Sequence, residues 1–84
     1  MNNKVCVDLI VPAIDEKYNV FLPVNKKVIE VIYLLNKAIN ELTDDIFPLS
    51  NQLTLINAED GMIYNNDLTI LENKILNGSR LILL

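Results

Sequence analysis

Apolar and polar positions alternate with a period of two in residues 4–11 and again in residues 18–22. This alternation is typical of half-buried β-strands. Pro12 ends the first run and residues 14–17 read as a polar turn, so we expect a hairpin with a loop longer than two residues. The inward set is Val5, Val7, Leu9, Tyr18, Val20 and Leu22, and the outward set is Cys6, Asp8, Ile10, Asn19 and Phe21.

The period changes to that of an α-helix over residues 25–42, with Asn25 as the expected N-cap. The pair Lys26-Lys27 lies at the positive end of this helix and Glu41 at its negative end, so these charges oppose the helix macrodipole. Packing of one apolar stripe on a sheet must therefore stabilise the helix. The stripe is Val28, Val31, Ile32, Leu35, Ile39 and Leu42, and the side expected to face water carries Asn36, Lys37 and Asn40.

The second half of the chain holds shorter apolar segments separated by turn residues. Residues 52–57, 62–64 and 80–84 are predicted strands, with Leu53 and Leu55 pointing inward. The connections supply turns at 58–61 and at Asn77-Gly78, an apolar connector at 46–51 and a short helical turn within 68–76, where Leu68, Ile70 and Ile75 are expected to plug the core.

The predicted order β-β-α-β-β-β is that of an α+β fold, the β-grasp. We expect a single domain over residues 1–84, with a mixed sheet of four to five strands and one long helix packed across one face. The last strand should lie beside the first at the centre of the sheet. A ferredoxin-like sandwich is the alternative, but it needs a second long helix, and residues 65–79 are too short and broken to provide one.

Composition and charge restrict the function. The chain has 84 residues, a net charge of −4 and seven basic residues scattered among eleven acidic ones, which argues against nucleic-acid partners. Apolar residues make up 51% of this short chain, which indicates either a well-packed core or an exposed patch for a partner protein. The N-terminal run is broken at Asp8 and Pro12, so we expect no signal peptide, no membrane insertion and a cytoplasmic location.

Catalytic chemistry is not expected. The chain has no histidine and one cysteine, so it lacks a Cys-His or Ser-His pair, a zinc cluster and an iron–sulfur centre, and we predict no enzyme activity, metal or cofactor. The pair Asp44-Asp45 is expected to be solvated. Cys6 is interpreted as an inert small residue. The alternative is a redox role, for which Lys4 or Arg80 on the same face is the candidate cation beside the thiol.

Three segments resemble the second half of ubiquitin: Leu53-Thr-Leu-Ile-Asn-Ala-Glu-Asp-Gly-Met, Thr69-Ile-Leu-Glu-Asn-Lys-Ile and Ser79-Arg-Leu-Ile-Leu. The resemblance implies a ubiquitin-like domain. Ubiquitin and the sulfur carriers end in Gly-Gly, whereas this chain ends in Leu83-Leu84, so neither conjugation nor sulfur carriage is expected.

The chain is also similar to the YukD/EsaB-like family, small ubiquitin-like proteins of type VII secretion systems in Gram-positive bacteria. The similarity rests on the Ile46-Phe47 connector and on the end Ile75-Leu-Asn-Gly-Ser-Arg-Leu-Ile-Leu-Leu. It implies a cytosolic accessory or regulatory component that binds other proteins, with cytosolic parts of membrane secretion components as candidate partners. An adaptor or regulator unrelated to secretion, using the same surface, is the alternative.

The expected protein-binding site is the sheet face away from the helix. If Leu53, Leu55, Leu81 and Leu83 point inward, alternation turns their neighbours outward, and the corresponding face of ubiquitin is its main recognition patch. A partner protein or a second copy of the chain, giving a homodimer, would cover this face. The predicted contact residues are Ile56, Ile82 and Leu84 beside Thr54, extended across the hairpin by Ile10 and Phe21.

Overall fold

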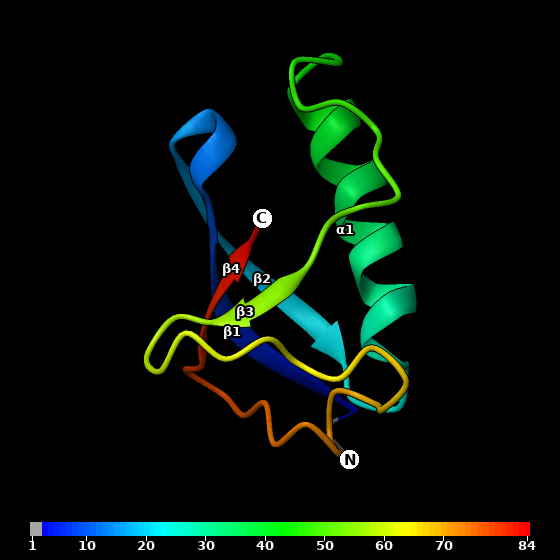
Figure 1. Cartoon of the computed structure of the whole chain (residues 1–84), viewed down its shortest axis with the longest axis vertical. Helices are drawn as coiled ribbons and strands as arrows, with labels where there is room; N and C mark the ends of the chain where they lie inside the picture. The colour runs from blue at the N-terminus through cyan, green and yellow to red at the C-terminus, as the bar shows by residue number, and fades with distance from the viewer. Residues whose placement is uncertain (1–2) are drawn as a thin grey trace.

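A four-stranded mixed sheet packs against one long helix in the computed structural model, which describes residues 3–84 (Figure 1). The strand order is β2-β1-β4-β3, with β1 parallel to β4 and the other neighbouring pairs antiparallel. The last strand thus lies beside the first, as predicted. The elements are β1 (Lys4–Val11), β2 (Glu16–Pro23), α1 (Val28–Leu42), β3 (Leu55–Asn57) and β4 (Arg80–Leu83).

The hairpin between β1 and β2 is tighter than expected. A 3₁₀ helix, η1 (Pro12–Ile14), starts the reversal, and Asp15 completes it in the left-handed conformation at φ 51°. The Asp15 N–H donates to the Pro12 carbonyl at 3.1 Å. Proline fixes φ and aspartate tolerates the left-handed region, so the chain reverses within four residues. Glu16 and Lys17, predicted as turn, therefore belong to β2.

The core lies between the sheet and α1 and contains the predicted inward positions of the strands. Leu9, Leu81, Leu83 and Leu55 are fully buried on β1, β4 and β3. Removing such side chains from water is the main favourable term in folding, at about 25 cal/mol per Å² of apolar surface. The remaining buried apolar residues are Val7, Val11, Leu22, Val28, Val31, Ile32, Leu35, Ile39, Phe47, Ile70 and Ile75.

The start of α1 is held by a distant loop. The N-cap is Lys27 rather than the predicted Asn25, and it makes no side-chain capping bond. Instead, the Val28 N–H donates to the Leu68 carbonyl at 2.9 Å and the Ile29 N–H to the Asn66 carbonyl at 3.2 Å. Backbone acceptors from the 65–71 segment thus satisfy donors that the first helical turn leaves unpaired.

The end of α1 differs from the prediction. Leu42 was expected in the apolar stripe but is 69% exposed. The chain turns back at Thr43, whose hydroxyl donates to the Ile39 carbonyl at 2.7 Å and accepts from the Phe47 N–H at 3.1 Å. Phe47 completes the core here, while the other apolar side chains of the connector, Ile46 and Leu49, are exposed.

The second half of the sheet is shorter than predicted. The strand expected over 52–57 is regular only in β3, and the strand expected at 62–64 is an isolated bridge between Ile56 and Ile63. Residues 68–76 contain one helical turn, in which the Asn73 N–H donates to the Thr69 carbonyl at 3.0 Å. Ile70 and Ile75 are buried there as predicted, whereas Leu68 is exposed. Gly78 adopts the predicted positive φ, at 86°.

Candidate functional site

A row of isoleucines crosses the outer face of the sheet. Ile10 on β1 is in register with Ile82 on β4, and Ile82 is in register with Ile56 on β3. The isolated bridge adds Ile63, which is exposed, while the other three side chains are half-buried. Directly opposed side chains on one sheet face contact each other, so the structure brings Ile10, Ile56 and Ile82 of the predicted site together.

Leu84 and Thr54 extend this row toward the C-terminal end of β4. Thr54 and Leu84 exchange backbone hydrogen bonds of 2.8 and 3.0 Å, and the Thr54 hydroxyl donates to the Leu84 carbonyl at 3.2 Å. Leu84 is 57% exposed and Thr54 is half-buried. We define the isoleucine row as Ile10, Ile56, Ile82, Leu84 and Thr54.

Phe21 is not part of that row. It pairs with Cys6, whereas Ile10 pairs with Lys17 at the other end of the hairpin. Phe21 and Lys17 are four positions apart, which corresponds to about 13 Å along a strand. Phe21 is 69% exposed, so it is a separate apolar position on the same face.

Polar side chains fill the gap between Phe21 and Ile10. The Asn19 side-chain amide donates to Asp8, and its carbonyl oxygen accepts from the Cys6 thiol at 3.3 Å. Asp8 is also in register with Arg80. The Cys6 thiol is thus half-buried within a hydrogen-bonded network. A shallow hollow of about 380 Å³ lies beside Ile10 and is lined by Asp8, Lys17, Tyr18, Asn19 and Arg80.

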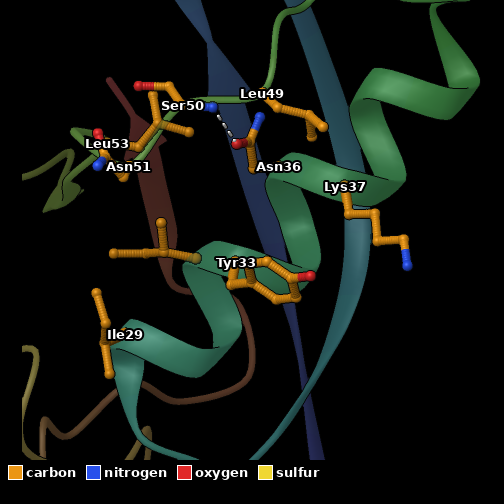
Figure 2. Close-up of a pocket in the computed structure, with 9 residues that line it drawn as sticks. Ile29, Tyr33, Asn36, Lys37, Leu49, Ser50, Asn51 and Leu53 are labelled. Carbon is orange, nitrogen blue, oxygen red and sulfur yellow. Dashed lines mark hydrogen bonds between the residues drawn. The ribbon is translucent and has the colours of Figure 1, made fainter.

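A second surface lies on the opposite layer, between α1 and the connector (Figure 2). The groove has a volume of about 740 Å³. Part of the lining comes from α1 and part from the segment that faces it. The first part includes Ile29, Tyr33, Asn36 and Lys37, and the second is Leu49, Ser50, Asn51 and Leu53. Its apolar lining and the exposed Tyr33 make it a second candidate contact surface.

Asn36 holds this groove in shape and was wrongly predicted to face water. It is only 4% exposed. Its side-chain nitrogen donates to the Pro48 carbonyl at 3.0 Å, and its side-chain oxygen accepts from the Ser50 N–H at 2.8 Å. The connector therefore packs along α1. A buried asparagine needs such partners, because an unpaired amide in the interior is costly.

The sequence interpretation missed the groove. A signal was present, since Ile29 and Tyr33 are four residues apart and form a second apolar line on α1 beside the main stripe. Leu49, however, reaches that line only because the connector folds back, and no local pattern predicts this return.

Two titratable groups have shifted pKa values. The Thr69 N–H, which donates to Glu72 at 2.9 Å, and the Thr69 hydroxyl lower the pKa of Glu72. Burial raises the pKa of Tyr64, and the carboxylates of Asp60 and Glu59 raise it further. Across residues 3–84 no three Cys, Asp or Glu side chains come together as a metal site, and no helix in that range is long and apolar enough to span a membrane.

Solved structures with the same fold include several ubiquitin-like domains. The EccD5 ubiquitin-like domain from Mycobacterium xenopi has a TM-score of 0.79 and 21% identity, over 99% of this chain and 94% of that one. The ubiquitin-like domain of the Mycobacterium tuberculosis type VII secretion system protein EccD1 has a TM-score of 0.75 and 14% identity, over 100% and 99% of the two chains.

A chain of the MycP5-free ESX-5 inner membrane complex has a TM-score of 0.81 and 20% identity. The match covers 99% of this chain but 21% of that one, so the chain corresponds to about a fifth of that protein's length. No family model and no curated protein matches the sequence. At these identities the comparisons establish the fold, and the predicted ubiquitin-like β-grasp is confirmed.

Proposed function

We propose that the chain is a non-catalytic protein-interaction module that serves as a cytosolic accessory or regulatory component of a type VII secretion system, similar to the YukD/EsaB-like proteins. The observation that carries the proposal is the match of almost the entire chain to ubiquitin-like domains of EccD proteins, with TM-scores of 0.75 and 0.79. Fold alone does not define a function, so the proposal also needs a surface on which a partner protein can bind.

The isoleucine row supplies an apolar contact surface. Ile10, Ile82 and Ile56 lie side by side on the layer that α1 does not cover. The row also contains the exposed Leu84, and the exposed Ile63 lies beside it, so together they offer an apolar surface that a partner can desolvate. Candidate partners are the cytosolic parts of membrane components of the secretion system.

A pull-down from detergent-solubilised host lysate tests this proposal. The wild-type chain should capture secretion-system membrane proteins, and Ile82→Asp should lose them because a carboxylate in the middle of the row stays charged and unpaired on binding. Leu42→Asp is the matched control, since Leu42 is an exposed apolar residue at the far end of α1. It should capture the same proteins as the wild type.

Two outcomes would contradict the proposal in different ways. Capture by the wild type and by both variants alike would keep the pathway and remove the isoleucine row as the site. Capture of proteins unrelated to secretion would favour the alternative, an adaptor that uses the same fold elsewhere. Deleting the protein from its host should in addition alter the secretion of the small helical substrates of the system.

A further inference from the structure

Charged side chains of alternating sign follow the side of α1 that faces away from the sheet. At 3.6 residues per turn Glu30, Lys37 and Glu41 lie on one side of α1. Lys26 precedes the helix and lines a shallow hollow together with Glu30, Tyr33 and Leu34, which places it at the end of the same strip. Tyr33 and Leu34, 66% and 47% exposed, lie in the middle of the strip. The charged members are Lys26, Glu30, Lys37 and Glu41, and all four are exposed.

The order of these charges is self-complementary. The midpoint between Tyr33 and Leu34 is equally far in sequence from Glu30 and Lys37, and equally far from Lys26 and Glu41. A second α1 that runs in the opposite direction over the same midpoint therefore places a lysine opposite each glutamate. A parallel arrangement in the same register would place like charges together, so the pattern selects one orientation.

We infer that this strip is a self-association surface, on which a second copy of the chain packs with its α1 antiparallel to the first. A twofold axis near Tyr33 and Leu34 brings each of these side chains close to its own counterpart. Glu30 of each copy then faces Lys37 of the other. The apolar centre and the flanking charges form one continuous contact.

The charges at the ends of the helix support the antiparallel orientation. In a single chain Lys26 lies at the positive end of α1 and Glu41 near its negative end, which is unfavourable. In the antiparallel pair the start of one helix adjoins the end of the other. Lys26 of one copy then faces Glu41 of the second, and a placement that destabilises the lone helix stabilises the pair.

The association is weak and reversible. A helix of 15 residues is about 22 Å long, and one pair of such helices buries less than the roughly 800 Å² per partner of a standard stable interface. The isoleucine row lies on the other layer and remains open. A dimer thus presents two sheet faces, which raises the apparent affinity for a partner with two matching sites.

Sedimentation velocity over a concentration series tests the inference. The wild-type chain should self-associate, and K37E and E30K should each weaken the association about tenfold, because each change replaces both symmetry-related attractions by repulsions. A mixture of the two variants should associate to within about threefold of the wild type. In the mixed dimer the two glutamates of one chain face the two lysines of the other.

The matched control for K37E is K17E, which makes the same change of net charge, from −4 to −6, at an exposed residue of β2. It should associate like the wild type, and circular dichroism should show that every variant remains folded. A wild-type chain that stays monomeric up to about 1 mM overturns the inference. So does equal association of wild type, K37E and E30K, or a mixture that stays monomeric.

Discussion

The outer face of the sheet and the outer face of α1 expose apolar residues in different ways. On the sheet, Ile10, Ile82 and Ile56 come from three strands and meet through register. On the helix, Tyr33 and Leu34 are neighbours in sequence and lie between charges of alternating sign. The first surface exists only in the folded sheet, whereas the second is present in any helix formed by this segment.

This difference has consequences for recognition. An apolar row bordered by polar residues gains affinity from desolvation and depends little on salt. A strip of alternating charges gains orientation and partner choice, and its interactions are screened by salt. This difference agrees with the two partners proposed above, a foreign protein for the sheet face and a second copy of the chain for the helix face.

The largest expected effect is a difference in unfolding free energy between substitutions on the inner and on the outer side of β4. Leu81→Ala should lower the free energy of unfolding by about 2–5 kcal/mol, since Leu81 is fully buried and its truncation leaves a cavity. Ile82→Ala, on the half-buried outer side, should cost less than about 1.5 kcal/mol. Urea unfolding measures both values. Equal losses would mean that the outer face is as tightly packed as the core.

The next largest effect concerns the two hydrogen bonds by which Asn36 holds the connector against α1. Asn36→Ala should lower the free energy of unfolding by about 1–3 kcal/mol, because the Ser50 N–H and the Pro48 carbonyl lose their partner. Hydrogen exchange at the Ser50 amide should become faster. Lys37→Ala, one residue away and exposed, is the control and should change neither quantity by a comparable amount.

A smaller effect is the different salt dependence of binding through the outer face of α1 and through the outer face of the sheet. Raising the salt concentration from about 0.05 to 0.5 M should weaken self-association several-fold, because the exposed ion pairs are screened. Capture of a partner through the isoleucine row should change little over the same range. Sedimentation and pull-down at both concentrations measure this contrast. The reverse order of sensitivities would show that the two surfaces have been assigned to the wrong partners.

The smallest effect lies in the segment below the start of α1. The bonds from Thr69 lower the pKa of Glu72 in the folded chain, so their stabilising effect is full above the unfolded pKa and is lost as the pH falls through the folded pKa. Thr69→Ala keeps the backbone donor and removes the hydroxyl, so the pKa of Glu72 should rise part of the way toward its ordinary value. An NMR titration of the Glu72 carboxyl measures it.

Several features were predictable because they depend on local periodicity. The alternation in residues 4–11 identified Val7 and Leu9 as inward and Ile10 as outward, and the structure places them so. The positive φ of Gly78 followed from its turn sequence. The grouping of Ile10 with Ile56 and Ile82 was also predicted, because alternation assigns a face to each residue once the strand order is known.

Other features were outside the reach of such patterns. The burial of Asn36 depends on Pro48 and Ser50, which return to α1 only after the chain has reversed. The exposure of Leu42 and the separation of Phe21 from Ile10 depend in the same way on where the helix leaves the core and where the strands pair. A periodic pattern predicts the direction of a side chain within its own helix or strand, but not which residues from other parts of the chain contact it.

The sequence by itself thus determined the first hairpin, the helix, the last strand and their order, because these follow from apolar spacing and turn residues within a few positions. It also carries the alternating charges of α1. Only the tertiary structure decided that Phe21 lies apart from the isoleucine row, how the 65–71 segment satisfies the first turn of α1 and where the groove forms. These features join residues tens of positions apart, and such contacts are set by the packing of the whole chain.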